Sequence, residues 1–135
     1  MTPADRAVRT GYVVFAHGSR IESANQAVRT VAADVACAGG LERVEAAFLE
    51  LGQPDMEGAV AKLAAEGIRR VVIIPYFLTL GLHLERDLPA IVSRIGKAHP
   101  GVELITTPPL DGHPGLVTIL LDRARGPGGP PQTAR

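Results

Sequence analysis

Four short runs of apolar and β-branched residues alternate along the chain with four longer segments whose apolar residues recur at helical spacing. The short runs cover residues 11–16, 44–49, 70–77 and 102–106, and the helical segments cover residues 23–38, 55–66, 84–98 and 114–125. Nearly continuous apolar strands that alternate with helices are typical of a parallel sheet covered on both faces. The pattern therefore predicts an α/β fold.

The length of the chain limits this fold to one domain. With 135 residues, of which 46% are hydrophobic, the chain is long enough for one packed core and too short for two. Right-handed crossovers favour the strand order 2-1-3-4. We therefore predict one three-layer α/β domain over residues 1–125, with a four-stranded parallel sheet. Residues 126–135 are rich in glycine and proline and are predicted to form a disordered tail.

Composition excludes several kinds of partner. The 14 basic and 14 acidic residues cancel, so no overall field would attract nucleic acid or an anionic membrane. The longest apolar stretch, residues 71–82, is interrupted by Pro75 and Gly81 and is shorter than the roughly 20 residues that span a bilayer. The first residues lack the apolar segment of a secretory signal, and Cys37 is the only cysteine. We expect a cytoplasmic protein that binds neither nucleic acid nor membrane.

Polar residues follow the carboxyl ends of three predicted strands. In a sheet of order 2-1-3-4 the winding reverses between strands 1 and 3, and ligands bind in the crevice outside their carboxyl ends. The loop after the first strand holds His17, the loop after the third strand ends in His83, and Glu50 follows the second strand. We expect these three side chains to converge on one crevice.

Two imidazoles and one carboxylate are a suitable ligand set for a divalent ion such as Co, Ni, Fe or Zn, with one coordination position left open. A neutral imidazole also accepts protons near neutral pH, so one histidine could hold metal while the other accepts a proton. Each residue has a structural alternative as well, because a histidine at a strand end often only makes hydrogen bonds and a carboxylate often caps a helix. His99, near a predicted helix end, is interpreted as structural, and His113 precedes the last helix.

Four segments of the sequence match the motifs of one known family, from Val13 to about Arg123. They read VVFAHGSR followed by Ala24-Asn25, VEAAFLELGQPDMEGAVAKLAAEG, RRVVIIPYFLTLGLHLERDLPAIV and PPLDGHPGLV. Together they resemble the small sirohydrochlorin chelatases, which are class II tetrapyrrole chelatases. The third segment is the most specific of the four. In the last segment Asp111 stands where the family usually has glycine.

This resemblance implies an activity and a site. It implies a lyase-type cobaltochelatase or ferrochelatase that inserts a divalent metal into sirohydrochlorin, in cobalamin or sirohaem biosynthesis. The metal, as Co²⁺, Fe²⁺ or Ni²⁺, is a substrate, and no tightly bound cofactor is implied. The implied metal-binding and catalytic residues are His17, His83 and Glu50. Larger class II chelatases contain two such domains, so the resemblance also implies that this chain is a chelatase-like half that forms a homodimer.

The ring of sirohydrochlorin carries acetate and propionate groups, which require basic side chains or exposed backbone N–H groups. Ser19 and Arg20, at the start of the first predicted helix, are therefore candidates for substrate binding. Each has a structural alternative, because Ser19 could cap that helix and Arg20 could be a solvated surface charge.

Two other functions stay open at this point. A strand that ends in histidine and glycine can supply a phosphohistidine nucleophile in phosphoryl transfer, although Ala16 stands where the expected arginine would precede His17. A metal or tetrapyrrole carrier without catalytic turnover could use the same ligands. Imidazole and carboxylate ligands suit cobalt, iron and nickel alike, so the sequence does not select among these metals.

Overall fold

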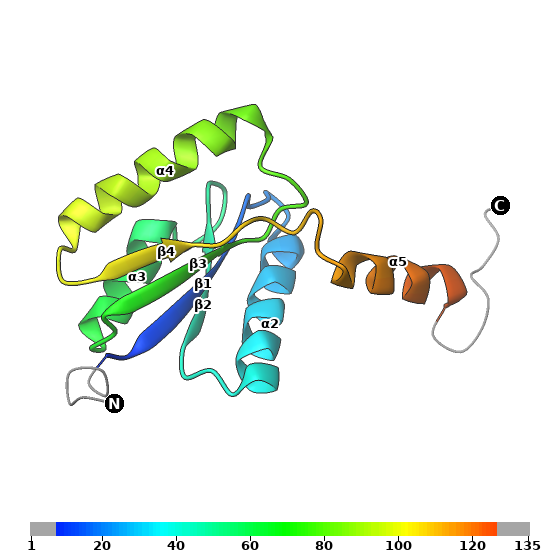
Figure 1. The fold of residues 1–135 in the computed structure, drawn as a ribbon, viewed down its shortest axis with the longest axis horizontal. Helices are drawn as coiled ribbons and strands as arrows, with labels where there is room; N and C mark the ends of the chain where they lie inside the picture. Colours follow the sequence, from blue (N-terminus) through cyan, green and yellow to red (C-terminus); the bar gives the residue numbers. More distant parts are fainter. Residues whose placement is uncertain (1–7, 127–135) are drawn as a thin grey trace.

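The computed structural model describes residues 8–126, which form one parallel sheet and four helices (Figure 1). The strands are β1 (Thr10–Ala16), β2 (Val44–Phe48), β3 (Arg70–Pro75) and β4 (Glu103–Thr106). The helices are α2 (Glu22–Gly39), α3 (Met56–Ala65), α4 (Gly81–Ala98) and α5 (Gly115–Arg125). The sheet has the order β2-β1-β3-β4 with all pairs parallel, which confirms the predicted α/β fold. Of the predicted disordered tail, residues 127–135 lie outside the described residues.

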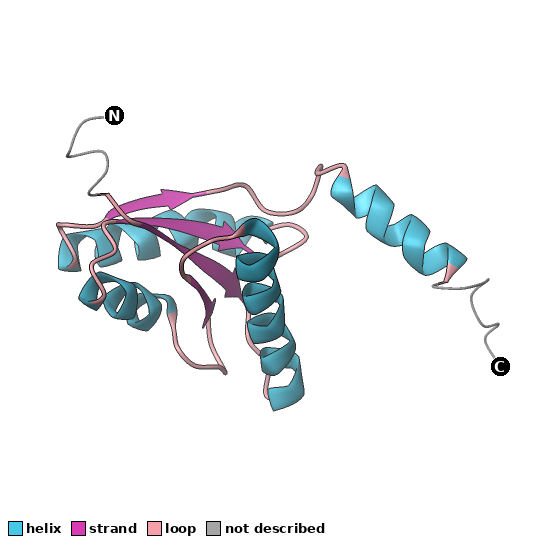
Figure 2. Ribbon diagram, turned by 90° about the horizontal axis from the view of Figure 1, so that it is seen from below, coloured by secondary structure: helices cyan, strands magenta, loops and turns pink. Residues whose placement is uncertain are grey.

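Strand β1 is apolar from Gly11 to Ala16 because both faces of the sheet are covered there. The helices α2, α3 and α4 surround the sheet (Figure 2). Val14 and Ala16 belong to the smaller core on the α2 side, whereas Val13 and Phe15 belong to the larger core on the side of α3 and α4. Side chains alternate between the two faces of a strand, so a strand that is buried on both faces shows no polar alternation. This burial is what made the strand recognisable in the sequence.

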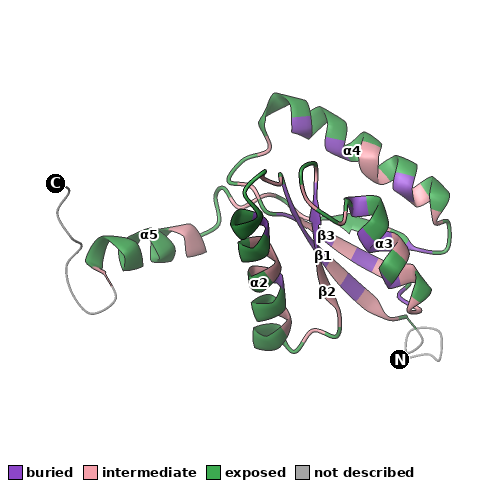
Figure 3. Ribbon diagram, turned by 180° about the vertical axis from the view of Figure 1, so that it is seen from behind, coloured by how far each residue is buried: buried purple, intermediate pink, exposed green. Residues whose placement is uncertain are grey.

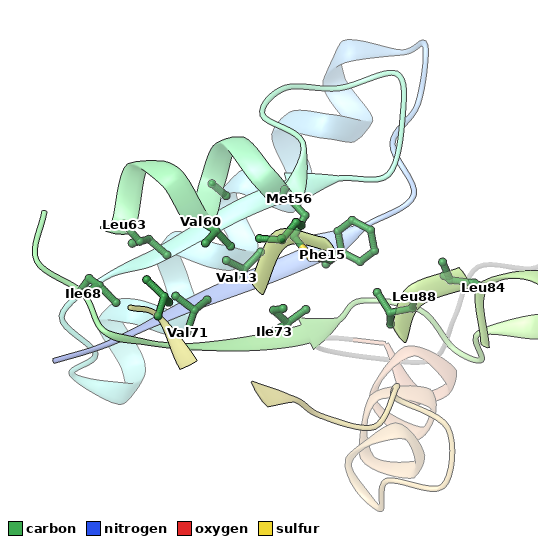
Figure 4. Packing of buried hydrophobic residues seen from close by; sticks show 14 residues of the cluster. Val13, Phe15, Met56, Val60, Leu63, Ile68, Val71, Ile73, Leu84 and Leu88 are labelled. Atoms are coloured by element: carbon green, nitrogen blue, oxygen red, sulfur yellow. The ribbon is translucent and has the colours of Figure 1, made fainter. Parts of the chain in front are cut away.

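The larger core lies between the sheet and the helices α3 and α4 (Figure 4). Phe15, Val60, Leu63 and Ile73 in this core are almost completely inaccessible to solvent. Burying a side chain of this kind stabilises a fold by about 1.5–3 kcal/mol. The core fixes both helices on β1 and β3, and it thereby fixes the loops at the carboxyl ends of these strands.

The start of α4 differs from the prediction. The helix begins at Gly81 rather than at residue 84, and Pro89 lies in its interior on an exposed position. The early turns are held by Leu84 and Leu88, which are one turn apart and buried against the core. Because these contacts outweigh the missing hydrogen bond at the proline, His83 lies in the first turn of a helix and not in the preceding loop. The other element ends differ from the prediction by at most two residues.

A charged cluster joins the start of β2 to α3 at the edge of the sheet. The carboxylate of Glu45 lies 2.7 Å from a guanidinium nitrogen of Arg43 and 3.1 Å from Nζ of Lys62. Arg43 also pairs with Glu66. Burial raises the pKa of Glu45, but the hydrogen bonds from Arg43 and Lys62 together outweigh burial, so the pKa is lowered. The folded state therefore favours the ionised carboxylate.

This lowered pKa predicts a pH-dependent contribution to stability. Glu45 stabilises the fold above the pKa of an unfolded glutamate, about 4.5, and this contribution disappears as the pH falls through the lower pKa of the folded state. The Glu45→Gln variant should therefore lose less free energy of unfolding than the unmodified protein between pH 6 and pH 3. Urea titrations across this range measure the difference. Asp34→Asn, which removes an exposed carboxylate on α2, serves as the control, and equal losses in Glu45→Gln and the unmodified protein would contradict the prediction.

Candidate metal centre

His17 is the first residue after β1, and its ring has a defined orientation. Nδ1 lies 3.1 Å from the carbonyl oxygen of Gly18. Because a carbonyl oxygen can only accept a hydrogen bond, Nδ1 carries the hydrogen in this contact, and Nε2 of the neutral ring carries the lone pair. Metal-binding histidines commonly donate one ring N–H to a carbonyl group in this way and bind the ion through the other nitrogen.

Glu50 faces the lone pair of His17. The distance between Oε1 of Glu50 and Nε2 of His17 is 3.4 Å, and both side chains are 58% exposed. A carboxylate oxygen and an imidazole lone pair are both acceptors, so they repel each other unless a proton or a cation lies between them. The pair can therefore hold either a proton or a metal ion, and its exposure leaves it open to exchange with solvent.

The loops that follow β1 and β2 are in backbone contact, which brings this pair together. The backbone N–H of Glu50 donates to the carbonyl oxygen of His17 at 3.0 Å. Gly18 has a φ of +95°, and a Cβ at this position would lie 1.7 Å from the carbonyl oxygen of Glu50. Only glycine allows the two loops to approach each other so closely.

Asn25 in the first turn of α2 connects the same two loops, a role that the sequence did not predict. The residue is 2% exposed. Its side-chain oxygen accepts from the N–H of Ser19 at 2.8 Å, and its amide nitrogen donates to the carbonyl oxygens of Ser19 and Leu51 at 2.8 and 3.1 Å. Asn25 belongs to the opening motif that carries the family resemblance, but nothing in the sequence shows that this position is buried.

Removing this amide should destabilise the protein. In Asn25→Ala three backbone groups lose their partner, and leaving a buried polar group unsatisfied costs about 1–3 kcal/mol. We expect a loss of this order in the free energy of unfolding, measured with urea, together with weaker cobalt binding, because the loops of His17 and Glu50 lose one of the links between them. Gln26→Ala, an exposed neighbour, is the matched control. An Asn25→Ala protein as stable as this control would contradict the prediction.

His83 and His17 line the same pocket. The pocket has a volume of about 380 Å³. The residues that line it are His17, Leu49, Phe77, Leu80, Gly81, Leu82, His83, Leu84, Asp87 and Ile91. It lies at the carboxyl ends of β1 and β3, where the winding of the sheet reverses. This is the crevice that the sequence predicted for both histidines.

Glu50 does not line this pocket, and it contacts His17 from the side of β2. Within residues 8–126, no three histidine, cysteine, aspartate or glutamate side chains lie close enough together to hold one ion. The structure thus pairs His17 with Glu50 and places His83 in the pocket wall, separate from the pair. The three-ligand site of His17, His83 and Glu50 stays a prediction that requires rotation of exposed side chains.

Ser19 and Arg20, the predicted substrate-binding residues, lie in the loop between His17 and α2. The hydroxyl oxygen of Ser19 accepts from the N–H of Ile21 at 3.0 Å. The position before α2 is occupied by Ile21, so Ser19 organises the turn and does not cap the helix. Its own O–H is still available as a donor. Arg20 is exposed and makes no hydrogen bond or ion pair within the described part of the chain. Their role in substrate binding stays a prediction.

The remaining histidines have local structural roles. His99 ends α4, with its N–H donating to the carbonyl oxygen of Ile95 at 3.0 Å. Nδ1 of His113 accepts from the N–H of Gly115 at 2.9 Å, at the start of α5. Neither residue lines the pocket that holds the other two imidazoles. No helix within residues 8–126 is long and apolar enough to cross a membrane.

Comparison with known proteins matches residues 11–126 to the family model named CbiX. The sirohydrochlorin cobaltochelatase of Methanococcus aeolicus is 30% identical over 84% of this chain and 96% of its own length. That of Methanopyrus kandleri is 40% identical over 57% of this chain and 54% of its own length. The chloroplastic sirohydrochlorin ferrochelatase of Arabidopsis thaliana is 30% identical over 84% of this chain and 50% of its own length. The alignment therefore spans only about half of the last two relatives.

Solved structures share the fold. A CbiX protein from Marinobacter aquaeolei VT8, described as a cobalamin biosynthesis protein, superposes with a TM-score of 0.74 at 26% identity, over 84% of this chain and 92% of that one. SirB from Bacillus subtilis, solved with Fe³⁺, superposes with a TM-score of 0.79 at 21% identity, over 87% of this chain and 47% of SirB. At this identity SirB supports the fold alone.

Proposed function

Because the chain belongs to the CbiX family, we propose that it is a sirohydrochlorin chelatase, which inserts cobalt or ferrous iron into a modified tetrapyrrole. The observation that supports this most directly is the pairing of His17 with Glu50, together with the presence of His17 and His83 in the lining of one pocket. The names of the relatives from Methanococcus and Arabidopsis cover cobalt and iron. Nickel stays a prediction from the ligand chemistry.

The pocket suits one face of a flat macrocycle. Its volume falls within the roughly 300–1,000 Å³ that is usual for small-molecule sites. Leucine, isoleucine and phenylalanine residues make up most of its lining, and His17, His83 and Asp87 are its polar residues. The apolar walls would hold the ring by contact, and the polar groups would act on the nitrogens at its centre.

Insertion exchanges two pyrrole N–H protons for one divalent ion, so the total charge of the macrocycle does not change. The protein must therefore present a metal ion and accept protons at the same place. We assign delivery of the metal to His17 and Glu50, because Nε2 of His17 and Oε1 of Glu50 lie 3.4 Å apart, close enough for both to bind one cation. His83, which lines the same pocket as His17, can accept a pyrrole proton in its neutral form, or it can complete the metal site if its exposed side chain rotates.

The proposal also includes a homodimer. The alignment covers 50% of the Arabidopsis relative and 54% of the Methanopyrus relative, so two copies of the aligned segment correspond in length to about one copy of either protein. The second copy would close the side of the pocket that one domain leaves open. The compartment in which the protein acts stays a prediction, since the Arabidopsis relative is described as chloroplastic.

The test is an insertion assay under anaerobic conditions with sirohydrochlorin and either Co²⁺ or Fe²⁺. We expect the absorbance of the macrocycle to change with many turnovers per protein chain, faster than without protein. A carrier would stop after one equivalent, and a phosphoryl-transfer enzyme would instead hydrolyse an aryl phosphate. A rate equal to the uncatalysed rate with both metals would overturn the proposed function.

A further inference from the structure

Arg29 on α2 contacts the loop that carries Glu50, although it does not line the pocket. This loop, residues 49–55, is called the Glu50 loop below. Most of α2 is exposed, and its buried residues are Asn25 and Ala32 (Figure 3). The side chain of Arg29 is 31% exposed, and one of its guanidinium nitrogens donates to the carbonyl oxygen of Gln53 at 3.0 Å. Arg29 therefore links α2 to the far half of the Glu50 loop.

The guanidinium of Arg29 is held in place by other contacts as well. Its second terminal nitrogen lies 2.6 Å from a carboxylate oxygen of Glu22 and 3.2 Å from the side-chain oxygen of Gln26. Its central carbon lies 5.3 Å from the centre of the Phe48 ring, within the range of a cation–π contact. Ion pairs as exposed as that with Glu22 contribute little to overall stability. The main effect of these contacts is therefore to fix where the guanidinium lies.

The Glu50 loop requires such support because its backbone is strained. Leu51, directly after Glu50, has a φ of +61°, which is uncommon for a residue with a side chain. Its side chain is 50% exposed, so packing against the core does little to hold it. The next residue, Gly52, crosses the ring of Phe48 so closely that a Cβ would lie 2.7 Å from Cγ. A strained conformation of this kind persists only where surrounding contacts hold it.

Two side chains of α2 supply contacts to this loop. Asn25 and Arg29 are four residues apart, so they lie on the same side of the helix. Asn25 donates to the carbonyl oxygen of Leu51 at 3.1 Å, and Arg29 donates to that of Gln53. The loop is thus held at the first and third residues after Glu50.

We propose that Arg29 is a positioning residue for metal delivery. By holding Gln53, it keeps the Glu50 loop in the strained conformation that directs the carboxylate of Glu50 to Nε2 of His17. The inference rests on the proposed function in assigning metal delivery to this pair. Arg29 does not line the pocket that would hold the macrocycle, so its loss should weaken metal binding and leave binding of the macrocycle unchanged.

A cobalt titration of Arg29→Met tests this role. Methionine keeps an unbranched apolar side chain over Phe48 but removes the donors, so fewer chains hold the loop in the binding conformation. Because the apparent dissociation constant rises as that fraction falls, we expect cobalt binding to weaken about 10-fold. Arg70→Met is the matched control, because Arg70 pairs with Glu103 at 2.8 Å at the start of β3, the opposite end of the sheet. Unchanged affinity in Arg29→Met, or equal weakening in both variants, would overturn the proposal.

Hydrogen exchange shows whether the loop itself is released. The backbone N–H of Glu50 is bonded to the carbonyl oxygen of His17, and in Arg29→Met it should exchange at least about 10-fold faster because the loop opens more often. The N–H of Tyr76, which is bonded to the carbonyl oxygen of Phe15, should exchange at its unmodified rate. If both groups kept their rates, Arg29 would not hold the loop and the proposal would be wrong.

Insertion kinetics separate metal delivery from binding of the macrocycle. Arg29→Met should raise the cobalt concentration that gives the half-maximal rate and leave the KM for sirohydrochlorin unchanged. A raised KM for sirohydrochlorin with normal cobalt affinity would assign Arg29 to macrocycle binding and contradict the proposal. If the unmodified protein inserted no metal, the proposed function would fail, but the cobalt titration and hydrogen exchange would still decide the role of Arg29.

Discussion

Replacing either His17 or His83 with alanine is expected to lower the rate of metal insertion by at least about 100-fold, the usual loss when acid–base assistance is removed. His17 supplies the lone pair that faces Glu50 at 3.4 Å, and His83 is the second imidazole in the wall of the same pocket. Both side chains are exposed, so their removal should leave the fold intact. The measurement is the change in sirohydrochlorin absorbance on adding Co²⁺ or Fe²⁺, with circular dichroism as the check on folding.

A cobalt titration of the same variants separates the two roles of histidine. His17→Ala and Glu50→Gln should weaken cobalt binding, because each removes one side of the pair. If His83 accepts protons, His83→Ala should bind cobalt normally and still fail to insert it. If His83 is instead a third metal ligand, His83→Ala should lose both cobalt binding and insertion. His99→Ala changes a histidine at the end of α4 and should insert metal at the unmodified rate. A folded His83→Ala protein with full activity would remove the site proposed here.

Gly18→Ala is expected to be the most damaging single substitution for the structure. The new Cβ would lie 1.7 Å from the carbonyl oxygen of Glu50, and the backbone φ of +95° is unfavourable for any residue with a side chain. Because backbone cannot yield as a flexible side chain does, the loops after β1 and β2 must separate. We expect a loss of at least about 3 kcal/mol in the free energy of unfolding, within the range of strained backbone combined with a buried clash.

Gly40→Ala isolates the contribution of the backbone conformation. Gly40 also has a positive φ, +61°, but a Cβ there would meet nothing within 4 Å. Its replacement should cost only about 1 kcal/mol. Urea unfolding compares the two variants, and cobalt binding shows whether the His17–Glu50 pair survives. Equal losses of stability at the two positions would mean that the close approach of Gly18 to Glu50 does not hold in solution.

The strand order was predictable because it follows from local sequence patterns and from a general rule on the handedness of crossovers. Each strand is a short apolar run, each helix has apolar residues at helical spacing, and right-handed crossovers leave few arrangements for four such strands. The same reasoning placed His17 and His83 at one crevice, since both follow strands that are neighbours at the reversal point of the sheet. Their presence in one pocket agrees with this expectation.

The position of Glu50 relative to the two histidines was less predictable. It depends on how far a loop extends from a strand, and this distance is set here by the contact between Gly18 and the backbone of Glu50. Spacing in the sequence gives the strand that a residue follows but not the direction of its side chain. For this reason the structure joins Glu50 to His17, while His83 lines the pocket that Glu50 does not line.

The sequence by itself determined the α/β class, the order of the sheet and the crevice, because apolar periodicity and crossover handedness are properties of segments and of their sequence order. Tertiary structure alone decided the burial of Asn25, the start of α4 before His83, and the outward direction of α5. Each of these depends on contacts between distant segments: three backbone groups around one amide, two leucines against the core, and a connection bonded to the end of β3. Apolar residues at helical spacing predict that one side of a helix is packed. Only the geometry of the surrounding chain decides which surface that side packs against.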